Sequence, residues 1–284
     1  MWIRKTPKKK GTEKQEGAFV NTQTKLYAVL MVFFMVLSSV PFADAEEEEA
    51  DTPSANLNVS FFSQYVWRGY ELSKDSLVIF PSLTVGYKGF DLNVWVDFDT
   101  HYKGTGTHEL WETDWVLTYS NNWEILSFTF GWIDYDVDAS GLVAAGRGNT
   151  PVATGLDAQE VFLSLGVDIP LSPTLGVYRE IQNGPAWYFK FDLSHSFEFE
   201  NGWSLDLGAW VGYNDNETAD YRSWHDGTVW AGLNIPLNEY FTVTPAVNYT
   251  FPLSKGADTL LQATSFDGND SQHVYGGIIV DCSI

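Results

Sequence analysis

Two pairs of titratable residues could act on a water molecule if the fold brought them together. Asp97 and Asp99 are separated by one residue, and His225 is followed directly by Asp226. Carboxylates beside a histidine–aspartate couple could serve as general bases, but only within hydrogen-bond reach of the water. Alternation along a strand would also place Asp97 and Asp99 on one face without any catalytic role. An outer-membrane hydrolase is therefore an alternative function, and we expect the protein not to be an enzyme.

Two further motifs resemble catalytic or metal-binding sequences but fail on geometry or residue type. In a strand, the side chains of Ser194-His195-Ser196 would point alternately to opposite faces, so the histidine cannot readily activate either serine. Residues 134–145 begin like a calcium-binding loop, but the sixth and twelfth positions are alanine instead of glycine and glutamate. No phosphate-binding loop, dinucleotide motif or zinc-binding spacing occurs. We expect no metal and no cofactor.

The main functional candidates are polar and aromatic residues that alternate with apolar ones. Acids predominate in this set, and rings of carboxylates favour cations in a pore. An indole ring facing a pore can stack on a ring-shaped solute or simply fill space. Because an unpaired charge is costly in a dry interior, the set predicts a water-filled lumen, or else protonated or paired charges. The expected channel-lining residues are Arg68, Trp95, Asp97, Asp99, Glu112, Asp114, Lys190, Asp192, Asp206 and Trp210, and Asp91, Glu160 and Glu198 share their parity.

These candidates lie on segments whose side chains alternate between apolar and polar. Trp187, Phe189 and Phe191, for example, alternate with Lys190 and Asp192. A period of two predicts β-strands with one apolar and one polar face. The expected strands are 56–67, 76–87, 90–100, 109–119, 123–134, 158–169, 174–181, 186–199, 203–214, 226–235, 239–251 and 272–283.

The connections between these segments alternate between short and long. We expect tight turns at 88–89, 121–122, 170–173, 201–202 and 236–238, and longer loops at 68–75, 101–108, 135–157, 182–185, 215–225 and 252–271. Outer-membrane barrels have an even number of strands, short turns at one end and longer loops at the other. No amphipathic helix is visible that could cover the apolar faces, as a soluble β-sandwich would need. The sequence predicts an all-β protein, a closed antiparallel transmembrane β-barrel of about 12 strands.

The first 45 residues have the order of a secretory signal peptide. Seven basic residues precede the uncharged run 26–40, and Ala43-Asp44-Ala45 fits a cleavage site, so we expect cleavage near Ala45. The run is shorter than the roughly 20 apolar residues that span a bilayer. The leader carries seven of 16 basic and three of 37 acidic residues, which leaves a mature chain with a formal charge of −25. Such a charge disfavours nucleic acid as a partner.

The mature chain is expected to have two parts. Residues 46–54 form an acidic periplasmic tail, and residues 55–284 form the barrel. The 12 Trp, 14 Tyr and 19 Phe suit a barrel with aromatic belts at both membrane interfaces. The single Cys282 excludes an intramolecular disulfide.

The start of the mature chain resembles a known family. Ser63-Gln64-Tyr65-Val66-Trp67-Arg68-Gly69, Pro81-Ser82-Leu83 and Lys88-Gly89-Phe90, followed by Val94-Trp95, are similar to the opening of the TorF-like porins, which are bacterial outer-membrane barrels. The resemblance covers about the first third of the mature chain and implies a channel without naming its solute. Ile284 departs from the terminal aromatic residue that the barrel-assembly machinery reads.

Together these features predict an outer-membrane porin-like channel for passive diffusion of small hydrophilic solutes, with a preference for cations. The expected partners are outer-membrane lipid and lipopolysaccharide, the barrel-assembly machinery, and small solutes or cations. The main alternative is a plugged barrel with a structural or surface-interaction role and no transport.

Overall fold

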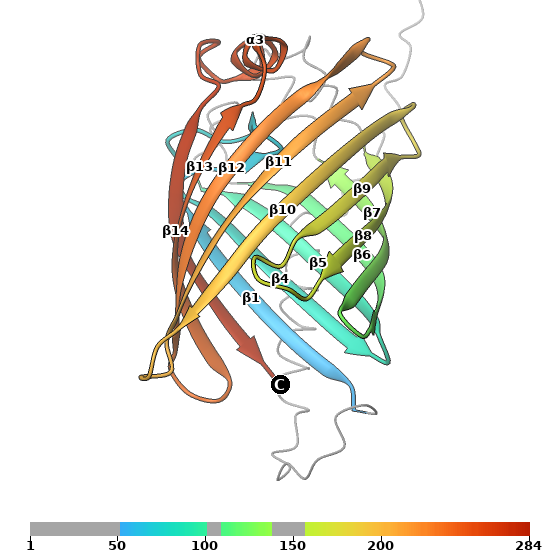
Figure 1. Cartoon of the computed structure of the whole chain (residues 1–284). Coiled ribbons are helices and arrows are strands. Elements are labelled where there is room, and N and C mark those ends of the chain that lie inside the picture. Colours follow the sequence, from blue (N-terminus) through green and yellow to red (C-terminus); the bar gives the residue numbers. More distant parts are fainter. Residues whose placement is uncertain (1–51, 101–108, 138–156) are drawn as a thin grey trace, which may run out of the picture. The chain divides into compact units, whose positions relative to one another are not determined.

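The computed structural model describes residues 52–100, 109–137 and 157–284. Twelve antiparallel strands close into a barrel, which confirms the predicted architecture (Figure 1). The expected signal peptide, the acidic segment up to residue 51, and the expected loops within 101–108 and 138–156 lie outside the described residues.

The barrel order follows the chain, and the first strand pairs with the last. Two reciprocal backbone hydrogen bonds of 2.9 Å join Ala55 and Ile284, so the closing pair includes the last residue of the chain. The barrel strands are β1 (Ser54–Phe62), β4 (Val78–Tyr87), β5 (Phe90–Asp99), β6 (Glu109–Trp123), β7 (Leu126–Val137), β8 (Ala158–Val167), β9 (Thr174–Glu180), β10 (Ala186–Glu198), β11 (Ser204–Asn216), β12 (Tyr221–Pro236), β13 (Phe241–Pro252) and β14 (His273–Ser283).

The structure corrects three predicted boundaries. The predicted turn at 121–122 lies inside β6, and the chain turns at 124–125, where Glu124 has a left-handed φ of 51°. Most of the predicted loop 215–225 is strand, because β11 and β12 continue to a four-residue connection. The predicted strand 56–67 ends at Phe62, and a two-stranded hairpin follows, with β2 (Val66–Trp67) and β3 (Tyr70–Glu71).

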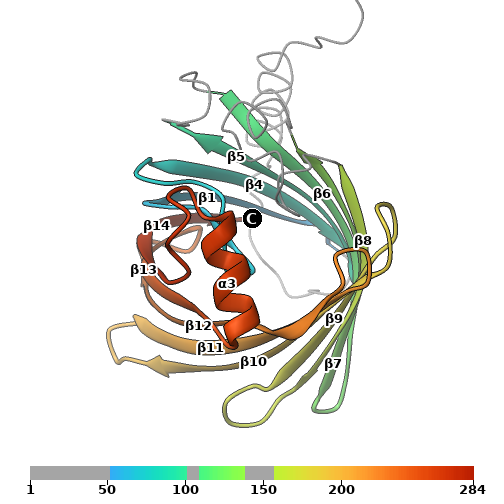
Figure 2. The same ribbon diagram turned by 90° about the horizontal axis from the view of Figure 1, so that it is seen from above.

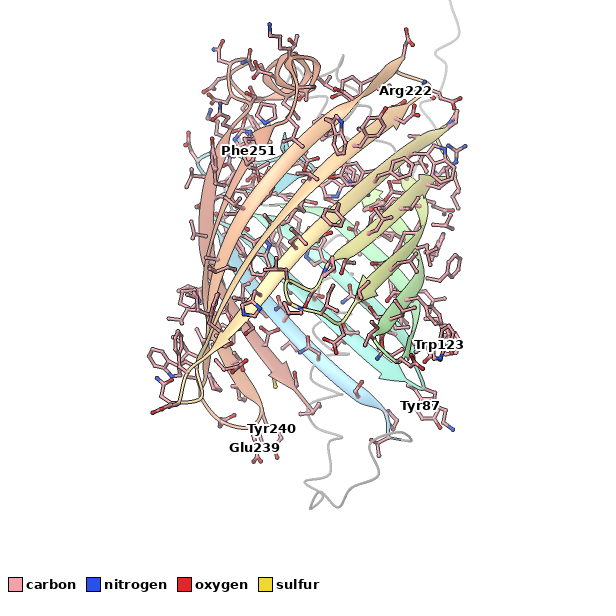
Figure 3. All side chains as sticks on the ribbon, viewed as in Figure 1. Tyr87, Trp123, Arg222, Glu239, Tyr240 and Phe251 are labelled. Atoms are coloured by element: carbon pink, nitrogen blue, oxygen red, sulfur yellow. The ribbon has the colours of Figure 1, made fainter. Side chains whose placement is uncertain are left out.

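The outer wall of the barrel is apolar, as the alternation requires. Phe130 and Leu165, for example, are 55% and 49% exposed. Aromatic side chains mark the end of the barrel that carries the turns 88–89, 124–125, 168–173, 199–203 and 237–240, which we call the short-turn end. Figure 3 shows Tyr87, Trp123 and Tyr240 at this end. An apolar band edged by aromatic residues is the surface that a bilayer requires.

The opposite end, which we call the long-loop end, carries a helix that the sequence did not predict. Helix α3 (Lys255–Thr264) lies in the connection between β13 and β14, and Ser254 caps it by accepting a hydrogen bond from the backbone N–H of Ala257. Leu261 is 1% exposed, and the helix contacts β3, β12 and β13. Figure 2 shows α3 within the ring of strands. Within the described ranges, no helix is long and apolar enough to span a bilayer.

Candidate functional site in the barrel lumen

The connection between β1 and β4 enters the barrel instead of extending away from it. Residues 63–77, here called the inserted loop, contact side chains of β4, β5, β6, β7, β8, β9, β10 and β12. A segment can touch so many strands around the ring only from the lumen. The inserted loop therefore occupies the long-loop half of the lumen.

Arg68 lies at the tip of the inserted loop and crosses to the far wall. Arg68 and Gly69 have φ values of 46° and 81°, and together they form the two-residue turn between β2 and β3. The Arg68 guanidinium donates two hydrogen bonds, of 2.8 and 2.7 Å, to the two carboxylate oxygens of Glu160 on β8. Burial alone would lower the pKa of Arg68, but the neighbouring Glu160 raises the pKa overall, so the guanidinium stays charged.

Three aromatic rings surround the same guanidinium. Its central carbon lies 4.5 Å from the ring centre of Trp67, 4.9 Å from that of Tyr178 and 4.2 Å from that of Tyr188. These distances are in the range of cation–π attraction, which is stronger where water is excluded. The Arg68 side chain is only 14% exposed. Sequence parity had assigned Arg68 to the wall of a channel, but it extends from the inserted loop and reaches that wall from inside.

Tyr65 holds the opposite side of the inserted loop against a group of carboxylates. Its hydroxyl donates a 3.0 Å hydrogen bond to Glu112 on β6. Burial, and then the nearby carboxylates of Glu112, Asp114 and Asp97, raise the pKa of Tyr65 well above its usual value, so the phenol remains a donor. Among the described residues, neither carboxylate oxygen of the fully buried Asp97 has a hydrogen-bond partner. Asp97, Asp99, Glu112 and Asp114 are all buried.

Tyr70 packs against a β-bulge on a third side. The register between β11 and β12 shifts at Val211/Tyr213, where His225 and Asp226 together oppose one residue. Both are fully buried. The ring centre of Tyr70 lies 5.1 Å from that of His225.

The inserted loop is also tied to the segment that follows α3. Lys74 makes ion pairs of 2.6 and 2.7 Å with Asp267 and Asp270. Glu71 accepts a hydrogen bond of 2.8 Å from the backbone N–H of Phe266. Hydrogen bonds and charge from Lys74 lower the pKa of Asp270. These contacts make the inserted loop and the segment after α3 one connected unit.

An apolar cluster packs the inserted loop against the wall in this half of the lumen. Trp95 stacks on Phe80 with ring centres 5.0 Å apart and also contacts Tyr65. Trp95 is partly buried and packs the inserted loop against the wall. The buried members of the cluster are Tyr65, Tyr70, Leu72, Val78, Phe80 and Leu261.

The short-turn half of the lumen differs, because its wall carries small polar side chains. Parity and register put them on the inner face, because neighbours such as Val85 and Leu165 are exposed on the outer face. Many bond to each other along the wall: Asn93 donates to Ser82 at 2.7 Å, and Asn234 donates to Asp206 at 2.7 Å. Short hydroxyl and amide side chains suit a wall that faces water, in contrast to the aromatic cluster of the other half.

Between the two halves lies the remaining group of predicted lining residues. Lys190 makes a 2.7 Å ion pair with Asp192, and its ammonium lies 4.3 Å from the ring centre of Trp210. Trp210 also donates a 3.3 Å hydrogen bond to Asp226. Sequence reasoning did not single out Trp230, which shares the inward parity. Its ring lies over Gly208, where an added Cβ would come within 2.4 Å of it.

The two residue pairs considered for hydrolysis, Asp97/Asp99 and His225/Asp226, lie on different parts of the barrel wall. Asp97 lies on β5 opposite Glu112 of β6. Asp226 accepts hydrogen bonds from Tyr188 and Trp210, of 2.8 and 3.3 Å. The inserted loop contacts both walls and lies between the two pairs. Among the described residues, no group of three or more His, Cys, Asp or Glu side chains is arranged to hold a metal ion.

No protein-family model matches the chain, and no curated protein matches it by sequence. A closed antiparallel barrel of 12 strands with an apolar outer wall defines an outer-membrane, porin-like fold. The comparison with solved structures agrees: the KdgM porin is 11% identical with a TM-score of 0.50, and the match covers 81% of this chain and 99% of that one. The NanC porin is 10% identical over 80% of this chain and 98% of its own, with a TM-score of 0.48. At these identities the likeness extends to the fold alone.

Proposed function

We propose that this protein is an outer-membrane channel for passive diffusion of small hydrophilic solutes, with a preference for cations and a constriction formed by the inserted loop. The observation that carries the proposal is the division of the lumen. One half has small polar walls, and the other is narrowed by a segment that ionic and polar contacts hold alongside an aromatic cluster. Acidic residues on the inner face, such as Asp91, Asp192 and Asp206, would attract cations and repel anions.

The same proposal assigns a direction and partners to the barrel. The short-turn end, which also holds both ends of the barrel chain, would face the periplasm, and the long-loop end with α3 would face outward. The expected leader, the resemblance to TorF-like porins and the apolar outer wall support insertion by the barrel-assembly machinery into outer-membrane lipid and lipopolysaccharide.

A second candidate is a permanently plugged barrel with a structural or surface-interaction role. The buried apolar cluster between the inserted loop and the wall favours it, because such packing resists release. In this reading the ion pairs of Arg68 and Lys74 would lock the inserted loop in place.

Single-channel recording in planar bilayers separates the two candidates. If the protein is a channel, we expect discrete conductance steps and, in a KCl gradient, a reversal potential shifted from zero toward the potassium equilibrium potential. Replacing both Asp91 and Asp206 by Asn is expected to move that potential toward zero. Asp168→Asn, in an exposed short turn, is the matched control and is expected to leave it unchanged. Absence of conductance at all voltages would favour the plugged barrel.

A further inference from the structure

The surroundings of Arg68 form a recognition site for a guanidinium group. Glu160 supplies two acceptors in the geometry that matches the guanidinium fork, with distances of 2.8 and 2.7 Å. Tyr178 and Tyr188 present ring faces at 4.9 and 4.2 Å. Carboxylate and rings come from β8, β9 and β10, so they belong to the rigid wall and not to the inserted loop.

The wall residues of this site are held in place by partners other than Arg68. Tyr135 donates a 3.0 Å hydrogen bond to Glu160, and Tyr188 donates a 2.8 Å hydrogen bond to Asp226. The rings of Phe162 and Tyr178 stack with centres 5.2 Å apart. A site fixed by its own wall contacts keeps its shape when its occupant leaves, which lowers the cost of binding a replacement.

The occupant, in contrast, belongs to a connection between strands. Arg68 stands at the turn of a hairpin with two residues in each strand, and only Trp67 of its three ring contacts comes from that hairpin. The inserted loop therefore delivers a guanidinium to the wall in the manner of a tethered ligand. Whatever competes for the wall site would also loosen the tip of the inserted loop.

We propose that Glu160, Tyr178 and Tyr188 form a binding site for small guanidinium-bearing cations, which Arg68 occupies as an internal ligand. A solute of this class displaces Arg68, takes its place on the wall and thereby releases the tip of the constriction. The regulatory part of this proposal rests on the proposed channel function, whereas the binding site itself does not.

The binding site is tested by removing the Arg68 guanidinium that occupies it. Arg68→Ala protein, folded in detergent, is titrated calorimetrically with methylguanidinium chloride. Because no internal ligand competes, we expect it to bind at least about tenfold more tightly than wild-type protein. The double variant Arg68→Ala/Glu160→Gln is expected to lose this gain. Arg222→Ala is the matched control, because its guanidinium pairs with Asp215 at 2.9 Å but is 62% exposed; its affinity should equal that of wild type.

Folding is checked by circular dichroism before each titration. If Arg68→Ala does not fold, wild-type protein and Glu160→Gln are compared instead, and only the wild type is expected to respond to methylguanidinium with a change in tryptophan fluorescence from Trp67. Equal binding of methylguanidinium to Arg68→Ala and to the double variant, or equal fluorescence changes in the fallback pair, would overturn the site.

The link to the channel is tested in bilayers with the same probe. Methylguanidinium is expected to change the wild-type potassium current by more than an equal concentration of sodium does, because sodium can act only as a permeant ion. If potassium currents are present and the two cations act alike, the regulatory inference fails and the channel proposal stands. If no current appears but calorimetry detects the site, the channel proposal fails and the binding site stands.

Discussion

Loss of the Glu160 charge is expected to release the tip of the inserted loop without unfolding the barrel. The change is Glu160→Gln, which keeps the size of the side chain and removes one charge. Arg68 and Glu160 are 14% and 7% exposed and share two charge-assisted hydrogen bonds, so solvent screens their interaction only weakly. Removing one partner of a buried ion pair costs about 3–5 kcal/mol. Because glutamine retains one acceptor, we take about 3 kcal/mol, the lower end of that range.

The rate of trypsin cleavage after Arg68 measures this change, because cleavage requires the inserted loop to leave the lumen. If opening and closing are fast relative to cleavage, the cleavage rate follows the open population. At 1.4 kcal/mol for each factor of ten, a loss of about 3 kcal/mol raises cleavage at Arg68 by about two orders of magnitude. The site of cleavage is identified by mass spectrometry of the fragments.

The matched control is Glu180→Gln. Glu180 lies directly opposite Glu160 in the β8–β9 ladder, but one of its carboxylate oxygens accepts backbone N–H groups of Gln182 and Asn183. Cleavage at Arg68 should stay at the wild-type rate in this variant. If Glu160→Gln and Glu180→Gln are cut at the same rate, the ion pair does not hold the inserted loop and the reasoning is refuted.

Two further predictions concern the packing of Gly208 in the barrel wall and the ion pair between Lys74 and Asp270. Gly208→Ala should lower the free energy of unfolding in urea by about 1–3 kcal/mol, because its Cβ would overlap the ring of Trp230. Gly232→Ala, where the nearest atom lies at 3.1 Å, is the control, and an equal loss would contradict this reading. The lowered pKa of Asp270 means that its pairing with Lys74 is complete above the ordinary aspartate pKa of about 3.9 and is lost as pH falls through the lowered value. A carbon-13 titration of the Asp270 carboxyl should therefore show a midpoint below the ordinary aspartate value in wild type, and Lys74→Met should raise that midpoint. Equal midpoints in the two proteins would contradict the pairing of Lys74 with Asp270.

The pairing of neighbouring strands could be predicted in part from short turns. The tight turn near 201–202 sets the register of β10 and β11 and so places Asp192 opposite Trp210. The contact of Lys190 with Trp210 follows from that register. Tyr188 could also be identified from the sequence as an inward-facing residue, because it is an aromatic residue on the polar face of its strand. Its contact with Arg68 could not be predicted from the sequence.

The sequence by itself determined the barrel. Strand alternation is a local property with a period of two, so the inward and outward residues of each strand can be identified without knowledge of any distant contact. Closure then follows, because an apolar outer face and a polar inner face leave no other low-energy arrangement in a bilayer.

Only the tertiary structure decided what fills the lumen. The alternation continues past Phe62, which is why Arg68 was expected on the wall, but the chain leaves the sheet there and turns inward. Arg68 meets Glu160 across 92 residues of sequence, and Lys74 meets Asp270 across 196. Such contacts depend on which strands and loops face each other across the closed barrel, and the local alternation of side chains carries no information about this arrangement.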